Sequence, residues 1–258
     1  HESLRTTFAQ TPQGAQQRIH AATPLALPIE TVAEAELAAR VQAEVAQVFD
    51  LEQGPLLRVR LLRVAQDDHV LVVTQHHSVS DGWSMQVLVE ELVQCYAAFS
   101  QDEAPTLPVL PLQYADYAIW QRQWMEAGER ERQLGYWTER LAGEQFLQLP
   151  TDHPRPAEQS FRGAQLALAL PDNLAQGLQQ RARELRVTPF MLLLATFQVL
   201  LHRYSGQGDI RVGVPVANRN RLETERLIGF FVNTQVLRAE VEPGMAFTRL
   251  LLQVRHTA

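Results

Sequence analysis

Two apolar segments joined by a short polar turn constrain the fold of this chain more than any other feature. Residues 56–64 (LLRVRLLRV) alternate apolar side chains with arginine, which predicts a strand with one solvent-exposed face. Residues 69–74 (HVLVVT) form a near-continuous apolar run, which is typical of an inner strand. Because only a few polar residues around Gln66, Asp67 and Asp68 separate the two runs, we expect a β-hairpin.

Helical patterns are interleaved with these strands. Residues 34–49 carry apolar side chains at three- and four-residue spacing, which predicts an amphipathic helix. A second helix is expected directly after residue 84, with one core-facing row. That row consists of Met85, Leu88, Leu92, Cys95 and Phe99. Further helices are expected from residue 114, over 172–186, over 189–204 and over 246–256, and further strands over 161–170, over 210–216 and within 229–241.

The best internal boundary is the segment 149–156 (LPTDHPRP). Its three prolines cannot continue a helix or an inner strand. Strands interleaved with helices on both sides of it predict an α/β fold (α+β two-layer lobes) with two lobes divided near residue 155. We therefore expect one lobe over residues 1–155 and a second over 156–258.

Composition excludes several classes of protein. With 258 residues, 46% of them hydrophobic, and a net charge of −6, the chain is not expected to be disordered or to present a general nucleic-acid surface. No apolar run approaches the roughly 20 residues that a membrane span needs. A single cysteine excludes an internal disulfide framework and is typical of a reducing cytoplasm. The chain starts at His1 without a leader pattern and ends inside a helical pattern, so we expect a piece of a longer protein.

The strand-turn-helix around residues 70–90 is the segment that indicates chemistry. His76 and His77 end a buried strand, and Asp81 and Gly82 lead into a helix. Open α/β sheets place ligands at strand ends, and the unpaired N–H groups of a helix N-terminus favour negative charge. Histidine suits proton transfer near neutral pH. Asp81 is expected either to fix the loop through a partner or to act directly.

Plainer interpretations of the same segment exist. A histidine pair at a strand end is, without other context, more often a satisfied turn residue than a catalyst. A metal site formed with His69 is disfavoured because adjacent histidines on a strand point in opposite directions and no acid follows at ligand spacing. A serine nucleophile is disfavoured because the Gly-x-Ser-x-Gly elbow is absent.

Five segments together resemble the condensation domains of nonribosomal peptide synthetases. Residues 76–82 are similar to the HHxxxDG signature, and residues 1–6 to the HExLRT segment. Residues 114–121 resemble the YxDYAxWQ helix, 213–219 the GxPxxxR segment and 228–234 the IGFFVNT strand. The resemblance covers nearly the whole chain. It implies a chloramphenicol-acetyltransferase-like fold with two lobes around a tunnel.

The same resemblance implies that both ends of the domain are missing here. The family begins upstream of residue 1, and its later HQDxPF-type and RxxxNP-type segments would follow Ala258. Residues 1–155 would then be an N-terminal lobe without its first segment, and residues 156–258 a partial C-terminal lobe. Folding and activity of such a fragment in isolation are not implied.

The resemblance implies amide formation. The amine of a downstream aminoacyl group would attack the thioester of an upstream acyl or peptidyl group. Phosphopantetheine arms of two peptidyl carrier domains would carry both groups, next to an adenylation domain. No cofactor and no metal would be bound in this domain itself, and no nucleic-acid or membrane partner is expected. Because a thioester is already activated, the protein has only to position two tethered groups and handle one proton.

Roles for the motif residues follow from the resemblance. His77 would handle the proton and orient the amine, as a base or as a stabilising group. The backbone N–H of Gly82 would face the oxyanion. Asp81 would hold the loop through an ion pair, with Arg219 as the first-choice partner and Arg5 as the second.

Three further residues are expected to support the site. His76 is assigned a structural role, and Trp83 follows the motif directly. Asn233 either lines the cleft or satisfies backbone groups where its strand passes.

Three other functions compete with condensation. An epimerisation domain shares the double histidine, but the Gly-Trp-Ser run at residues 82–84 is unexpected there, and residues 80–84 look more like the subtype that joins two L-configured residues. A free-standing acyltransferase that uses coenzyme A thioesters would need a self-contained chain. An inactive condensation-like module would only recruit carriers or other partner proteins, which the intact His77, Asp81 and Gly82 disfavour.

Overall fold

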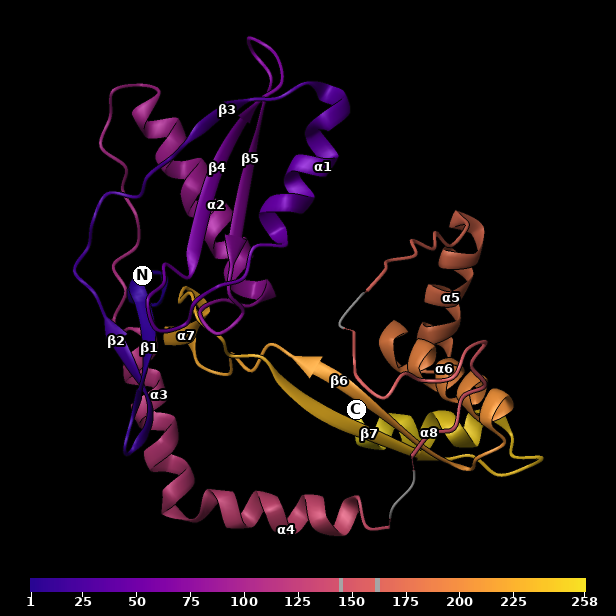
Figure 1. The fold of residues 1–258 in the computed structure, drawn as a ribbon. Helices are drawn as coiled ribbons and strands as arrows, with labels where there is room; N and C mark the ends of the chain where they lie inside the picture. Colours follow the sequence, from indigo (N-terminus) through magenta and orange to yellow (C-terminus); the bar gives the residue numbers. More distant parts are fainter. Residues whose placement is uncertain (144–145, 161–162) are drawn as a thin grey trace. The chain divides into compact units, whose positions relative to one another are not determined.

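The computed structural model describes residues 1–143, 146–160 and 163–258 (Figure 1). Two compact units are present. The first comprises His1–Gln133 and Val216–Asn233, and the second comprises Leu134–Pro215 and Thr234–Ala258. The proline-rich segment 149–156 lies inside the second unit. The assignment of residues 1–155 and 156–258 to two lobes of a complete domain stays a prediction.

A three-stranded sheet forms the centre of the first unit. Strands β4 (Leu57–Arg63) and β5 (His69–Gln75) pair antiparallel over their whole length, which confirms the predicted hairpin. The short strand β3 (Ile29–Thr31) adds to β4 in parallel. The pairing of Leu57 with Gln75 places the end of β5 beside the start of β4, so the chain leaves the sheet at this edge and enters the histidine motif.

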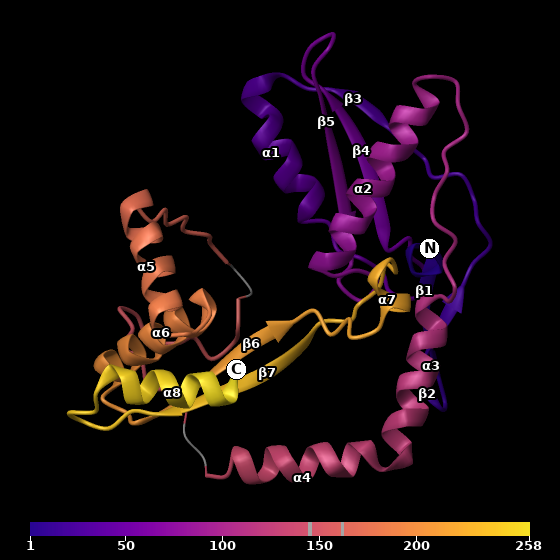
Figure 2. The ribbon, with the colours of Figure 1, turned by 180° about the vertical axis from the view of Figure 1, so that it is seen from behind.

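The predicted helices α1 (Glu34–Val45) and α2 (Gly82–Phe99) run alongside this sheet (Figures 1 and 2). Alternation along the strands turns Leu62 and Val72 inward, where they form a small core with Val32. Leu37 and Val41, one helical turn apart on α1, pack against that core. The apolar face of α1 therefore fixes the helix to the sheet.

The core-facing row expected on α2 is wrong. Leu92 and Phe99 are exposed, with 42% and 64% of their surface accessible. The buried residues of this helix are instead Ser84, Val87 and Glu91. Ser84 and Glu91 are buried because they are bonded to other parts of the first unit, and apolar spacing cannot reveal such polar anchors.

Shorter elements complete the first unit. They are the 3₁₀ helix η1 (Glu2–Arg5), the hairpin β1 (Thr6–Thr11) and β2 (Gly14–Ile19), the helix α3 (Tyr114–Trp124), the π-helical turn η2 (Met125–Glu129), and the short helix α7 (Leu222–Glu225). The helix α4 (Arg130–Arg140) follows η2. Gly128, with φ of +103°, provides the left-handed backbone that interrupts the helical run.

Besides residues 134–140 of α4, the described residues of the second unit form three helices and two strands. They are α5 (Asp172–Glu184), α6 (Pro189–Ser205), β6 (Asp209–Val216), β7 (Asn233–Glu240) and α8 (Phe247–Thr257). The predicted start of α6 is confirmed, because the Thr188 side chain accepts a hydrogen bond from the Met191 N–H at 3.2 Å and Pro189 occupies the first turn.

The strand expected over residues 161–170 is wrong for residues 163–170. These residues form no regular element and are exposed, so their alternating pattern has no partner strand and no core to face. Alternation alone does not make a strand, because backbone groups need a neighbouring strand to bond. Residues 161 and 162 lie outside the described part of the chain.

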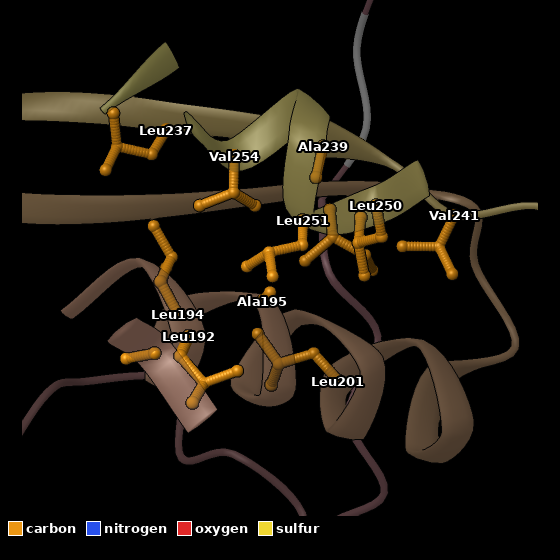
Figure 3. Packing of buried hydrophobic residues seen from close by; sticks show 12 residues of the cluster. Leu192, Leu194, Ala195, Leu201, Leu237, Ala239, Val241, Leu250, Leu251 and Val254 are labelled. Carbon is orange, nitrogen blue, oxygen red and sulfur yellow. The ribbon is translucent and has the colours of Figure 1, made fainter. Parts of the chain in front are cut away.

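The core of the second unit lies between its strands and helices (Figure 3). Leu250, Leu251 and Val254 of α8 pack toward α6, where Ala195 is fully buried. β7 contributes Leu237 and Ala239, and Val241 directly follows that strand. The i, i+1, i+4 spacing on α8 is the apolar pattern that predicted this helix, and the helix is confirmed.

The Arg211 guanidinium closes the C-terminal end of α4. Its Nη1 donates to the carbonyls of Leu141 and Gly143 at 3.0 and 3.1 Å, and its Nη2 donates to the carbonyl of Ala142 at 3.0 Å. Asp209 Oδ2 lies 2.8 Å from Nη2 and holds the guanidinium in place. The last carbonyls of a helix lack partners within it, so one arginine satisfies this end.

Within the described residues, no single helix is long and apolar enough to cross a membrane, although α5 and α6, bent by 103°, pass that test when taken together. The same part of the chain contains no cluster of three or more His, Cys, Asp or Glu side chains placed to hold a metal ion.

Candidate active site

The turn between β5 and α2 brings the motif residues together. The His76 N–H donates to the Leu56 carbonyl at 3.0 Å, which extends the sheet by one bond, and the Val79 N–H closes a turn onto the His76 carbonyl at 3.1 Å. Asp81 then caps α2, because its Oδ1 accepts the Ser84 N–H at 2.8 Å. Because Asp81 is the N-cap residue and accepts the N–H of the third helical residue, the helix begins at Gly82.

His76 is anchored within the turn. The Ser78 N–H donates to its Nδ1 at 3.1 Å, and the Ser78 hydroxyl lies 2.8 Å from the same atom. Because Nδ1 acts as an acceptor, a neutral His76 ring carries its proton on Nε2. The ring also meets Phe49 edge-on, with centroids 5.9 Å apart. These contacts agree with the structural role expected for His76.

His77 lies on the other side of the turn and is exposed. Its ring is perpendicular to that of Phe230, at an interplanar angle of 87° and a centroid distance of 5.1 Å. Across the described part of the chain, no group hydrogen bonds to either of its ring nitrogens. Both nitrogens of His77 are thus available to a reactant, in contrast to those of His76.

Asp81 and Arg219 form the expected ion pair. Arg219 Nη2 lies 3.1 Å from Asp81 Oδ1, and the side chains are 1% and 0% exposed respectively. Asp81 Oδ2 accepts the Phe231 N–H at 3.0 Å. Burial raises the pKa of Asp81, but the hydrogen bonds from Ser84 and Phe231 and the charge of Arg219 outweigh burial and hold that pKa below its usual value. The carboxylate is therefore ionised at neutral pH.

Arg219 also fixes the segment that follows it. Its Nη1 donates to the carbonyls of Thr224 and Leu227 at 2.5 and 2.8 Å, and its Cζ lies 4.0 Å from the centre of the Phe231 ring. Burial lowers the pKa of the guanidinium, and Asp81 raises it. Guanidinium stays protonated in proteins, so a buried cation and a buried anion meet beneath the histidine turn.

Ser84 is a member of this network that the sequence did not reveal as such. Its hydroxyl accepts from Arg219 Nη2 at 2.8 Å and from the Gly229 N–H at 3.0 Å. Its single proton can reach Asp81 Oδ1 at 2.7 Å or the Gly229 carbonyl at 2.9 Å. A hydroxyl has one proton and two lone pairs, so the side chain is saturated. The available signal was a serine three residues after a helix-capping aspartate.

Tyr114 contacts the same segment, residues 229–231. Its hydroxyl donates to the Phe230 carbonyl at 2.7 Å, and its ring passes so close to Gly229 that an added Cβ would lie 2.2 Å from Cδ2. Burial raises the pKa of Tyr114 to about 12. The phenol is therefore a hydrogen-bond donor at neutral pH, and residue 229 has to be glycine because of crowding.

Gly82 opens α2. As the first residue of the helix, its N–H has no carbonyl one turn earlier within the helix, so it is one of the unpaired donors of this terminus. A Cβ on Gly82 would meet no atom within 4 Å. The helix dipole at this end of α2 favours negative charge. The role of the Gly82 N–H toward an oxyanion stays a prediction.

The structure places the three remaining predicted residues, Arg5, Trp83 and Asn233, in different surroundings. Arg5 is not the partner of Asp81, because its guanidinium donates to the His20 carbonyl and to Glu2 Oε1. Trp83 is 44% exposed, and its Nε1 donates to the Glu225 carbonyl at 2.9 Å. Asn233 is exposed and begins β7. The ring centre of Trp83 lies 5.9 Å from the Cζ of Arg219.

The family model described as "Condensation domain" matches residues 1–258. The chain belongs to the condensation domain family. It is 50% identical to part of a linear gramicidin synthase from Brevibacillus parabrevis, in an alignment that covers 100% of this chain and 3% of that protein. This chain therefore spans a small fraction of that relative's length. The family predicted from the sequence motifs is confirmed.

Solved structures of similar proteins agree with the fold. The X-domain from teicoplanin biosynthesis superposes with a TM-score of 0.91 at 32% identity, covering 100% of this chain and 58% of that one. The epimerization domain from the third module of tyrocidine synthetase B gives a TM-score of 0.86 at 20% identity, covering 100% of this chain and 61% of that chain, which is a likeness of fold alone. The α/β, chloramphenicol-acetyltransferase-like fold class is confirmed.

Proposed function

We propose that this condensation domain forms a peptide bond between two thioester-bound groups. The downstream aminoacyl amine attacks the upstream acyl or peptidyl thioester, the new C–N bond forms, and the C–S bond breaks to release a thiol. The observation that carries this proposal is the exposed His77 imidazole, whose nitrogens are both unengaged within the described residues, in the turn that leads to Gly82 at the start of α2.

His77 is assigned the proton of the attacking amine. The nitrogen nucleophile loses a proton as the tetrahedral intermediate collapses, and imidazole is suited to accept it near neutral pH. An imidazole nitrogen that is not engaged elsewhere can also hold the amine by a hydrogen bond. Either role needs a side chain that faces the substrates, and His76 cannot take it because its Nδ1 is engaged by Ser78.

The backbone N–H of Gly82 is assigned the stabilisation of the oxyanion. The carbonyl oxygen of the thioester becomes negative when the amine adds, and an N–H at a helix N-terminus stabilises such an oxygen. The buried pair of Asp81 and Arg219 does not touch the reactants. It fixes the turn so that His77 and Gly82 keep their positions.

Partners are proposed on the same basis. Two peptidyl carrier domains would bring the reactants on phosphopantetheine arms, and an adenylation domain would load the acceptor. The arm is part of the substrate and is not a resident cofactor of this chain. The cytoplasm is the proposed location, in line with a chain that contains a single cysteine.

The decisive experiment uses the intact parent synthetase with donor and acceptor aminoacyl groups loaded on their carriers. Dipeptidyl thioester is followed by mass spectrometry for the wild type, His77→Ala and a control, His69→Ala. His69 is an exposed histidine at the far end of β5, where it accepts a hydrogen bond from Arg63. We expect His77→Ala to lower the rate by about tenfold or more, and His69→Ala to leave it unchanged, at equal loading.

Other outcomes select other functions. Equal rates for wild type and His77→Ala would remove His77 from the mechanism and leave substrate positioning as the main contribution. An inverted α-carbon without dipeptide would indicate epimerisation. Neither product would favour a module that only recruits partner proteins.

A further inference from the structure

The orientation of His77 is set without a hydrogen bond. Histidines that move protons are usually oriented by a carboxylate or carbonyl on their second nitrogen. Across the described residues neither nitrogen of His77 has such a partner, and the ring lies perpendicular to that of Phe230. An edge-to-face pair restricts the direction of both rings.

The backbone that carries Phe230 is held at four consecutive residues. The Ile228 carbonyl accepts from the Ser3 hydroxyl at 2.7 Å, and Gly229 is bonded through its N–H to Ser84. The Phe230 carbonyl accepts from Tyr114, and the Phe231 N–H donates to Asp81. These four hydrogen bonds fix the backbone on both sides of Phe230 and so restrict the direction of its side chain.

Two adjacent aromatic residues of this segment differ in burial and in the groups that they contact. Phe231 is 3% exposed and packs against Tyr114, Tyr117 and Arg219, whereas Phe230 is 41% exposed. A partly exposed ring contributes little to a core, so stability alone does not account for the position of Phe230. Its ring lies where it restrains His77.

We infer that Phe230 is a positioning residue, whose edge-on ring holds the His77 imidazole in the orientation needed to accept the amine proton. The inference rests on the function proposed above. It assigns to Phe230 the task that a hydrogen-bonded carboxylate performs elsewhere. The four backbone bonds of residues 228–231 then transmit the rigidity of the buried Asp81–Arg219 pair to the imidazole.

The test measures single-turnover dipeptide formation in the intact parent synthetase, with both carriers loaded. Phe230→Leu and Phe230→Met remove the ring, Phe230→Tyr keeps it, and Phe99→Leu is the control. Phe99 is a 64% exposed phenylalanine at the end of α2. We expect the Leu and Met variants to be slower by about three- to tenfold, the range that an edge-to-face pair supports. The Tyr and control variants should keep the wild-type rate.

A double-mutant cycle separates positioning from a general structural effect. In a His77→Ala background, Phe230→Leu should cause no further loss, because Phe230 acts through His77. An equal additional loss in that background would overturn the inference, as would a wild-type rate for both Phe230→Leu and Phe230→Met. If Phe230→Leu impairs carrier loading or folding, the comparison of the rates of Phe230→Met and Phe230→Tyr tests the inference instead. No effect of His77→Ala itself would instead refute the proposed function.

Discussion

Removing the charge of Asp81 should loosen the histidine turn strongly. Asp81→Asn changes one carboxylate oxygen to an amide group and leaves the shape of the side chain unchanged. Asn Oδ1 can keep the three bonds that Asp81 Oδ1 accepts from the Ser84 N–H, the Ser84 hydroxyl and Arg219. Its NH₂ group then faces the Phe231 N–H, which donates to Oδ2 in the native protein. One buried donor loses its acceptor, and a buried guanidinium loses its counter-charge.

The structure sets the size of this effect. Breaking a buried ion pair by altering one partner costs about 3–5 kcal/mol, and both side chains here are at most 1% exposed. Because the amide oxygen keeps the Oδ1 bonds, we expect the lower end, about 3 kcal/mol. That corresponds to about a hundredfold easier opening of the turn.

Hydrogen exchange followed by mass spectrometry measures this opening in the intact parent protein, on peptides covering residues 76–90. The matched control is Asp50→Asn. Asp50 is exposed, and its Oδ1 accepts the N–H groups of Glu52 and Gln53 at 2.9 Å each, so an amide oxygen replaces it at a cost of about 0.5 kcal/mol. If Asp81→Asn loosens its turn no more than Asp50→Asn loosens its own loop, the ion pair does not hold the site.

Four further outcomes are expected. Because folding lowers the pKa of Asp81, the ionised carboxylate stabilises the fold above its unfolded pKa of about 4, and this stabilisation is lost as the pH falls through the folded pKa. The hydrogen-exchange rates of wild type and Asp81→Asn should therefore converge in acid. Gly229→Ala should destabilise the first unit by about 1–3 kcal/mol or more, measured by the same exchange experiment, because its Cβ would lie 2.2 Å from Tyr114. Gly82→Ala should leave exchange unchanged, since nothing lies within 4 Å of the added Cβ, but should slow dipeptide formation by hindering approach to the amide. Arg211→Leu should speed exchange at residues 136–143, because about 1–3 kcal/mol is lost when several carbonyls lose a charged donor. Arg249→Leu is the control and should leave this exchange unchanged, because the Arg249 side chain is 66% exposed.

Local patterns in the sequence predicted much of the fold. The hairpin of β4 and β5, the helices α1, α5, α6 and α8 and the cap at Thr188 depend on neighbouring residues, and periodicity or capping chemistry revealed them. The hairpin of β1 and β2 was missed because residues 6–19 are mostly polar and small. Its turn at Thr11–Gly14 contains Pro12 and Gly14, a signal that was available.

The site was harder to derive because its contacts are long-range. Asp81 and Arg219 are 138 positions apart, and no local pattern links them, so the resemblance to the family supplied the pair. Ser84 and Glu91 interrupt the apolar row of α2 and for that reason were excluded from its buried face. Their burial follows from partners elsewhere in the chain, namely Gly229 and Arg226.

The composition of the first unit affects how the site is assembled during synthesis. His1–Gln133 belongs to this unit, but its last part, Val216–Asn233, is made only after the 82 residues of 134–215. At about 5–20 residues per second, the ribosome needs about 4–16 seconds for that stretch. Throughout this interval the Asp81 carboxylate has no Arg219 and the helix α2 lacks the segment that Ser84 binds. During synthesis, residues 1–133 therefore lack these partners, and we expect the histidine turn to become rigid only when residues 219–231 emerge.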